Sequence, residues 1–404
     1  MKRLISTLEN RTMRQLFIAL RNGTLVFAAI LLGATSASVA DENRTRQVNE
    51  QLDGLVREPL SLKVTLQDGR QATLDAFVTR PNKSGRFPIA LITHGTNGDA
   101  SDRKLNPNRF SSPAIAFARH GYAAVVVLRQ GYGKSTGDNE YVGGTCKSPR
   151  HARAGRVARD NLIAALKAIR DQPWASSDQT LLVGMSSGGF GVLATGALNP
   201  PGVQAVINFD GGRGAPEKGR FCDQNGLINA VRSYGQTAHI PTLWIYSTND
   251  KSFSPTLGRK MFDSYRQAGG VAEFFQTAAF EDDGHTILIS APESFWWQRV
   301  ALFLKNNKLS NEELVTLSSA NLSPPDNMSL SGYDAFKEYL AMQSYEKAFA
   351  TNVEGAWGWT TWARTREEAA KRAITLCQKG RKKNETECTL YAAGNQMAAH
   401  EKSH

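Results

Sequence analysis

The segment Thr180-Leu-Leu-Val-Gly-Met-Ser-Ser-Gly-Gly-Phe190 places a short apolar run directly before the pattern Gly184-x-Ser186-x-Gly188. The run Leu181–Val183 predicts a buried strand, and the glycines allow a sharp turn that lifts Ser186 above the end of a sheet. A side chain at either glycine would collide with the neighbouring strand or helix in such a turn. Because a new helix opens there, the backbone N–H of Ser187 would point toward the group that Ser186 attacks. The segment therefore predicts a nucleophilic serine at a strand–turn–helix junction.

A second segment, Gly133-Lys-Ser135-Thr-Gly137, matches the same five-residue pattern. It also follows an apolar run, Ala123–Leu128, but a stretch of polar residues and glycines separates that run from Ser135. The residues after Ser135 show no helical periodicity. Since the motif is meaningful only between a strand and a helix, Ser186 is the preferred nucleophile.

The rest of the chain up to about residue 305 alternates apolar runs with segments of helical periodicity. Ser61–Leu66 and Thr73–Thr79 alternate apolar and polar residues around Asp68-Gly69, which predicts an antiparallel hairpin. Continuous apolar runs follow, and these are typical of parallel strands covered on both faces. The runs are Ile89–Ile92, Ala123–Leu128, Leu181–Val183, Val203–Phe209 and Thr242–Tyr246. The pattern predicts a doubly wound, mostly parallel α/β sheet.

Polar residues follow the expected strands at the points where they end. His94-Gly95-Thr96 follows one strand, Asp210 and Asp250 follow two others, and His285 follows the last apolar segment. Ligands of open α/β sheets bind beyond the carboxyl ends of the strands. We therefore expect these residues to gather around Ser186.

In this arrangement the chain resembles the α/β-hydrolase fold over about residues 60 to 305, most closely its dienelactone-hydrolase-like and bacterial esterase branches. The resemblance rests on Ser186 in Gly-Met-Ser-Ser-Gly, on Asp250 in Asn-Asp-Lys-Ser-Phe-Ser-Pro, on His285 in Asp-Gly-His-Thr and on His94-Gly95. The order Ser, Asp, His along the chain is that of the fold. Dienelactone hydrolases use cysteine as the nucleophile, and this chain has serine.

The resemblance implies a Ser-His-Asp triad and an oxyanion hole. His285 is the one histidine that follows the acid and ends the last strand. Asp250 is the preferred acid, and Asp210 is the alternative because some members of the fold carry the acid after the sixth strand. The backbone N–H groups of Thr96 and Ser187 are the expected oxyanion donors.

The first forty residues read as a secretory signal peptide. Basic residues precede the apolar run Leu25–Leu32, and Ser38-Val-Ala40 fits a cleavage site after Ala40. We therefore expect a periplasmic or secreted protein without a stable membrane anchor after cleavage. An uncleaved anchor is the alternative.

Basic residues outnumber acidic residues, 48 against 37, but the excess is spread along the chain without dense blocks. This distribution disfavours a nucleic-acid partner. The apolar fraction of 41% and the charged fraction of 21% are ordinary for a globular enzyme.

The four cysteines contain no C-x-x-C pair, which disfavours a metal site and thioredoxin chemistry. Of the three possible disulfide pairings, the preferred one joins Cys146 to Cys222 and Cys377 to Cys388. The first of these disulfides would link two loops that we expect at one edge of the sheet. The second would crosslink the C-terminal tail.

The tail differs in character from the sheet domain. Residues 306–340 predict a linker with a short helix, after a catalytic domain at 41–305. Residues 341–404 predict a small ββαβ (α+β) module, in which Thr365-Arg-Glu-Glu368 opens the helix as a capping box. Its tryptophans favour core packing over stacking on a sugar or peptide.

The sequence thus predicts an exported serine hydrolase that cleaves small-molecule carboxylic esters through an acyl-enzyme, with no metal or organic cofactor. One alternative is a serine peptidase of the prolyl-oligopeptidase type. Another is a non-catalytic cell-wall or glycan-binding protein. The oligomeric state is left open.

Overall fold

A computed structural model of the 404-residue chain describes residues 54–96, 100–138, 146–318 and 320–398. All of these residues belong to one compact unit, Val48–His404. The predicted signal peptide and its cleavage site after Ala40 lie outside the described residues. Among the described helices, none is both long and apolar enough to cross a membrane.

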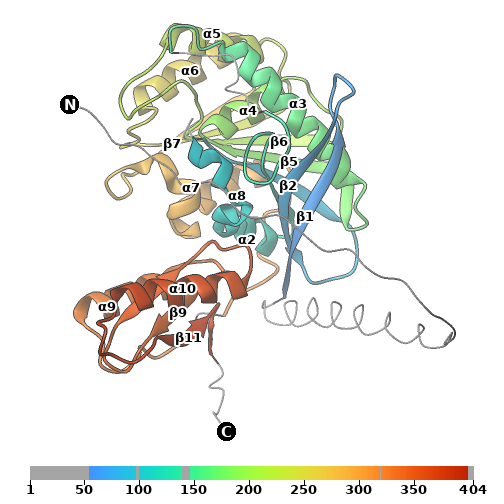
Figure 1. The fold of residues 1–404 in the computed structure, drawn as a ribbon. Helices are drawn as coiled ribbons and strands as arrows, with labels where there is room; N and C mark the ends of the chain where they lie inside the picture. Colours follow the sequence, from blue (N-terminus) through green and yellow to red (C-terminus); the bar gives the residue numbers. More distant parts are fainter. Residues whose placement is uncertain (1–53, 97–99, 139–145, 319, 399–404) are drawn as a thin grey trace, which may run out of the picture. The chain divides into compact units, whose positions relative to one another are not determined.

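The main sheet has eight strands in the order β1-β2-β4-β3-β5-β6-β7-β8 (Figure 1). β1 and β2 form the predicted hairpin, β2 pairs antiparallel with β4, and all other neighbours are parallel. This topology confirms the α/β-hydrolase fold. The strands are β1 (Leu55–Thr65), β2 (Gln71–Pro81), β3 (Phe87–Thr93), β4 (Ala123–Val127), β5 (Ala175–Met185), β6 (Val203–Phe209), β7 (Thr242–Ser247) and β8 (Ala272–Thr277).

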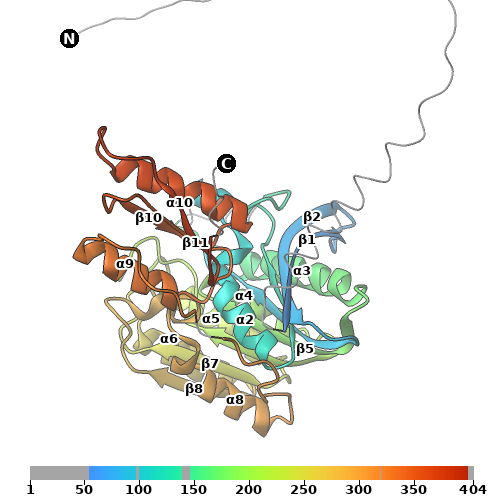
Figure 2. The ribbon, with the colours of Figure 1, turned by 90° about the horizontal axis from the view of Figure 1, so that it is seen from below.

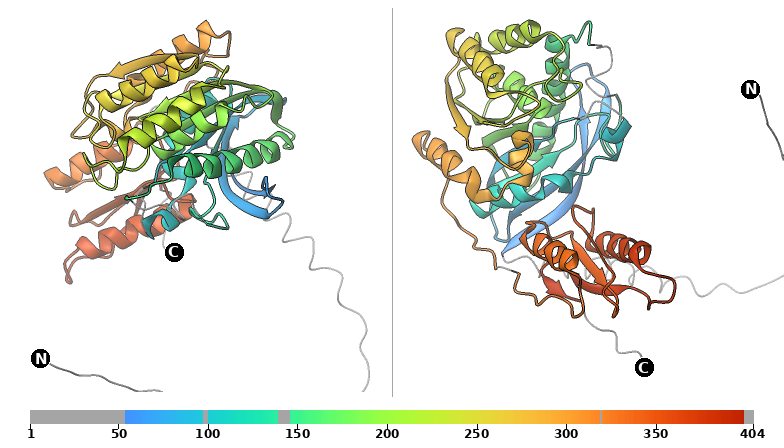
Figure 3. Two further views of the ribbon diagram at one scale, coloured as in Figure 1. Left: turned by 90° about the horizontal axis from the view of Figure 1, so that it is seen from above. Right: turned by 90° about the vertical axis from the view of Figure 1, so that its left-hand side faces the viewer.

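Helices cover both faces of this sheet. α3 (His151–Arg170), α4 (Ser187–Gly196), α5 (Gln224–Gly235) and α6 (Pro255–Gln267) pack on one face, toward the viewer in the left panel of Figure 3. α2 (Ser111–Arg119), α7 (Ile287–Ser290) and α8 (Trp297–Asn306) pack on the other, which Figure 2 shows. The continuous apolar runs are explained by this double cover. In β5, Leu182 packs toward the face covered by α3 to α6. Leu181 and Val183 pack toward the face covered by α2, α7 and α8.

Short 3-10 helices lie in the loops of the sheet domain. They are η1 (Ala100–Lys104), η2 (Pro107–Phe110), η3 (Gly284–Thr286) and η4 (Glu293–Phe295). η4 lies directly before α8 in the sequence.

The tail forms a separate antiparallel sheet in the order β10-β9-β11-β12. Its elements are β9 (Ala348–Thr351), β10 (Trp357–Thr360), α10 (Arg366–Gly380), β11 (Thr389–Ala393) and β12 (Gln396–Met397). The predicted ββαβ order is present, and β12 adds a short fourth strand. The Thr365 side chain accepts the N–H of Glu368, as expected for the N-cap of α10. α10 packs on Ala348 and Ala350 of β9.

The helix expected within the linker belongs to this unit. α9 (Leu330–Ala341) packs through Phe336 and Tyr339 on Phe349, whose side chain leaves β9 on the face opposite Ala348 and Ala350. Trp357 and Trp359 pack against the same cluster. We therefore place the start of the module near Met328 rather than at residue 341, and we call residues 328–398 the C-terminal module.

Both disulfides have the preferred pairing. Cys146–Cys222 joins the loop before α3 to the loop after β6, and Cys377–Cys388 joins α10 to the segment before β11. Disulfides persist in oxidising compartments, so the pair indicates an extracellular or periplasmic protein.

Candidate active site

Ser186 stands between β5 and α4 in a strained backbone conformation, with φ 55° and ψ −124°. The two glycines of the motif are required by close backbone approach. A Cβ at Gly184 would collide with the carbonyl of Gly188, and a Cβ at Gly188 would lie 2.5 Å from the carbonyl oxygen of His94. The tight turn thus depends on both glycines.

His285 lies on η3 and pairs with Asp250, which follows β7. The Nδ1–H of His285 donates to Oδ2 of Asp250 at 3.0 Å. The other carboxylate oxygen, Oδ1, accepts the backbone N–H groups of Ser252 at 2.7 Å and Phe253 at 2.8 Å. These bonds hold a carboxylate that is fully buried, and they leave Nε2 of His285 available as a base.

Asp210, the alternative acid, occupies a different position. Its carboxyl is fully buried and accepts the N–H of Ser247 at 3.0 Å. Burial, and then the neighbouring Asp250 carboxylate, raises the pKa of Asp210 well above its ordinary value. The structure therefore brings Asp250, and not Asp210, to the imidazole of His285.

The two expected oxyanion donors lie beside the serine. Ser187 is the first residue of α4, so its N–H has no acceptor within the helix. Thr96 lines the same cavity as Ser186. The Nδ1–H of His94 donates to the carbonyl of Gly95 at 2.6 Å. In a trans peptide the N–H points opposite to the carbonyl, so this bond turns the Thr96 N–H away from the His94 ring.

The neutral state of His94 follows from its surroundings. Its Nε2 accepts the backbone N–H of Arg129 at 3.1 Å, which assigns the proton to Nδ1. Burial, and then the charge of Arg129, lowers the pKa of His94 well below its ordinary value.

Arg129 is a supporting residue to which the sequence assigned no role. Its guanidinium is 1% exposed and donates to Thr93 Oγ1 at 2.7 Å, to the His94 carbonyl at 2.8 Å and to Ser187 Oγ at 3.1 Å. It thereby ties the Thr96 loop to the first turn of α4. The sequence feature that could have identified Arg129 is its position, as a charged residue directly after a wholly apolar strand.

Ser186 and His285 line one cavity of about 220 Å³. Its wall also carries Arg109 and Phe110 from η2, and Arg213 from the loop after β6. Among the described residues of this wall, two are arginines and none is aspartate or glutamate.

Two of the hydrogen bonds of Arg213 go to neutral acceptors. It donates to the carbonyl of Pro149 at 2.6 Å and to Nδ1 of His151 at 3.0 Å. Burial, and then Arg213, lowers the pKa of His151 to about 4. Arg150 and Arg153, at the start of α3, are exposed and lie outside the cavity lining.

No group of three or more His, Cys, Asp or Glu side chains within the described ranges is arranged to hold a metal ion.

Several solved structures are similar to this chain. An esterase from Pyrococcus furiosus is 16% identical, with a TM-score of 0.46, and the match covers 62% of this chain and 91% of that chain. Dipeptidyl peptidase 4 from Porphyromonas gingivalis is 16% identical, with a TM-score of 0.44, and covers 68% of this chain. A puromycin-hydrolyzing peptidase from Mycobacterium tuberculosis is 15% identical, with a TM-score of 0.43, and covers 63% of this chain. The matches span only 38% and 40% of the two peptidases.

No curated protein matches the sequence. The model of one protein family, described as X-Pro dipeptidyl-peptidase (S15 family), matches residues 68–371, which is more than half of the chain. With the hydrolase topology and the serine turn established, the chain belongs to the S15 peptidase family of serine hydrolases.

Proposed function

We propose that the protein is an exported serine hydrolase that cleaves carboxylic esters, with Ser186 as nucleophile, His285 as general base and Asp250 as the acid of the triad. The observation that carries this proposal is the 3.0 Å contact between His285 and Asp250 in a cavity that Ser186 also lines. No metal or organic cofactor takes part in it.

In the first half of the reaction, Nε2 of His285 accepts the proton of Ser186 Oγ as this oxygen attacks the ester carbonyl. The N–H groups of Thr96 and Ser187 bind the resulting oxyanion, and one such donor contributes about 3 kcal/mol of barrier lowering. His285 then protonates the leaving alcohol. In the second half, His285 activates a water that hydrolyses the acyl-enzyme.

The described lining of the cavity supports an ester substrate over a dipeptidyl one. A peptide with a free N-terminus carries a protonated amine at neutral pH, since α-amino groups have pKa values near 8. The described wall of the cavity contains no carboxylate that could receive that amine. A peptidase that removes X-Pro dipeptides is the second candidate, because the matching family model carries that description.

We further propose that residues 1–40 direct export and are removed after Ala40. The two disulfides support an oxidising destination. The N-terminal sequence of the exported protein should then begin at Asp41.

The ester proposal can be tested with three aryl esters that differ only in the acyl group. Because they share one leaving group, differences in intrinsic reactivity are reduced. Their acyl groups are neutral, anionic (a dicarboxylic monoester) and cationic (an aminoacyl ester). We expect kcat/KM to be lowest for the cationic ester by at least about tenfold. Arg213→Gln should reduce the preference for the anionic ester.

An X-Pro anilide with a free or an acetylated N-terminus tests the second candidate. We expect slow cleavage that does not depend on the free amine. Efficient cleavage that acetylation abolishes would establish the peptidase instead.

A further inference from the structure

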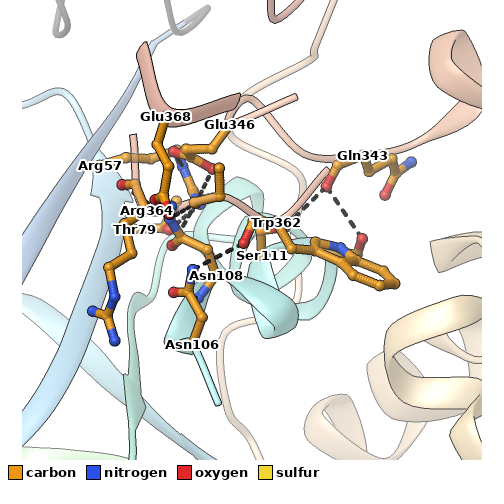
Figure 4. A network of polar contacts seen from close by, with 12 residues as sticks. Arg57, Thr79, Asn106, Asn108, Ser111, Gln343, Glu346, Trp362, Arg364 and Glu368 are labelled. Atoms are coloured by element: carbon orange, nitrogen blue, oxygen red, sulfur yellow. Dashed lines mark hydrogen bonds and ion pairs between the residues drawn. The ribbon is translucent and has the colours of Figure 1, made fainter. Parts of the chain in front are cut away.

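The C-terminal module contacts the segment 105–112, which includes η2 and forms part of the cavity wall (Figure 4). We propose that the module positions this wall of the active site, and that Asn106 and Asn108 are the positioning residues. The inference rests on the proposed function of the cavity, and it assigns the module a role in substrate binding.

The two asparagines donate to backbone carbonyls of the module. Asn106 Nδ2 donates to the carbonyl of Trp362 at 2.9 Å, and Asn108 Nδ2 donates to that of Ala363 at 2.8 Å. Asn106 also accepts the N–H of Asn108 at 3.1 Å and so caps η2. One side chain therefore fixes both the start of η2 and its attachment to the module.

A buried ion pair holds Asn108 from a second side. Arg57 of β1 donates to both carboxylate oxygens of Glu346 in the module, at 2.9 and 2.8 Å. The same guanidinium donates to Thr79 Oγ1 at 2.7 Å and to Asn108 Oδ1 at 3.3 Å. The Arg57 and Glu346 side chains are only 1% and 8% exposed, so this attachment is shielded from water and salt.

Two further contacts join the module to the sheet domain. Arg364 of the module donates to both oxygens of Asp75 in β2, at 3.1 and 2.7 Å. Ser112 Oγ donates to the carbonyl of Gln343 at 3.1 Å. A flexibly tethered module would not need such a set of buried, bidentate bonds.

The same segment supplies Leu105, Arg109 and Phe110 to the cavity. A 3-10 helix has about three residues per turn, so neighbouring side chains such as those of Asn108 and Arg109 point in different directions. Asn108 faces the module and Arg109 reaches the cavity. Releasing the asparagines from the module would let Arg109 and Phe110 shift, and it would weaken substrate binding without altering Ser186, His285 or Asp250.

The test uses the full chain with Asn106→Ser and Asn108→Ser, singly and combined. Serine at position 106 can still cap η2 but is too short to reach Trp362. Asn307→Ser is the matched control, since Asn307 also donates to a backbone carbonyl, that of Phe303 at 2.8 Å, outside the module contact. We expect KM for the aryl ester to rise about fivefold in the double variant, with kcat little changed. Amide hydrogen exchange in residues 105–112 should be faster than in the control.

Unchanged KM in an enzyme that hydrolyses the ester would overturn the positioning role and leave the proposed function intact. If the wild-type protein hydrolyses no ester, the proposed function fails. Amide hydrogen exchange in the variants then tests whether the module holds the segment 105–112 in place. Unchanged exchange in residues 105–112 would then reject it.

Discussion

The chain contains the pattern Gly-x-Ser-x-Gly twice, and the serines of the two copies lie in different surroundings. Ser186 sits at φ 55° between β5 and α4 and lines the cavity with His285. Ser135 lies in the loop after β4, where its Oγ donates to the carbonyl of Leu128 at 2.7 Å and accepts the N–H of Asp75 at 2.9 Å. Both serines are largely buried, at 7% and 3% exposure, so burial alone does not separate them.

The difference teaches that the partners of the hydroxyl decide its role. The Ser135 hydroxyl is engaged by backbone groups as both donor and acceptor, and it fastens the loop to β2. Ser186 instead lines a cavity together with Thr96 and with His285, and His285 is paired with Asp250. The following predictions test whether this distinction holds.

The largest effect should come from Ser186→Ala. Removing the nucleophile should lower kcat on an aryl ester by at least about 10⁴-fold, because the histidine and the acid act only through it. Steady-state kinetics on the purified variant measure this. Residual turnover within tenfold of wild type would remove Ser186 from the mechanism.

The next effect separates the two aspartates. Asp250→Asn should lower kcat by about 10⁴-fold, because the amide cannot hold the His285 tautomer or stabilise the imidazolium. Asp210→Asn should change kcat by less than about tenfold, because burial disfavours the charged form of Asp210 and asparagine has the shape of aspartate. The reverse order of effects would make Asp210 the acid.

Ser135→Ala should affect stability and not turnover. The variant leaves the Asp75 N–H and the Leu128 carbonyl without this partner, which should lower the free energy of unfolding by about 1–3 kcal/mol. Denaturant unfolding measures the loss. A fall in kcat comparable to that of Ser186→Ala, in folded protein, would mean that the second motif is catalytic.

A smaller effect, on the pH dependence of stability, concerns His151. Unlike His285, this histidine has no proposed catalytic role. Its folded pKa of about 4 lies below the usual 6.5, so the unfolded chain binds the proton more readily. Its contribution to stability is complete above about pH 6.5 and is lost as the pH falls toward 4. His151→Gln should therefore show a smaller drop in Tm between pH 7 and pH 4.5 than wild type.

The exposed His239 provides the control for this pH effect. His239→Gln should reproduce the wild-type drop in Tm. An equal drop in all three proteins would show that the protonation of His151 does not weaken the fold.

The sheet and the serine turn were predictable because their signals are local. Apolar runs such as Val203–Phe209 mark strands covered on both faces, and the glycines of the turn follow from close backbone approach. The resemblance to the α/β-hydrolase fold indicated His285, as the histidine that follows the acid and ends the last strand.

The cavity wall was not predictable, because it is formed by segments distant in sequence. Arg109 comes from η2 and Arg213 from the loop after β6, and neither has a local pattern that marks it. The pairing of Asn106 and Asn108 with a module some 250 residues later likewise required the structure.

Covalent labelling with a fluorophosphonate probe tests the central distinction most directly, because the reagent reports an activated serine without any assumption about the substrate. We predict that wild type and Ser135→Ala are labelled at the same rate, on Ser186, and that Ser186→Ala is not labelled. Equal labelling of Ser186→Ala, or no labelling of the wild-type protein, would contradict the account.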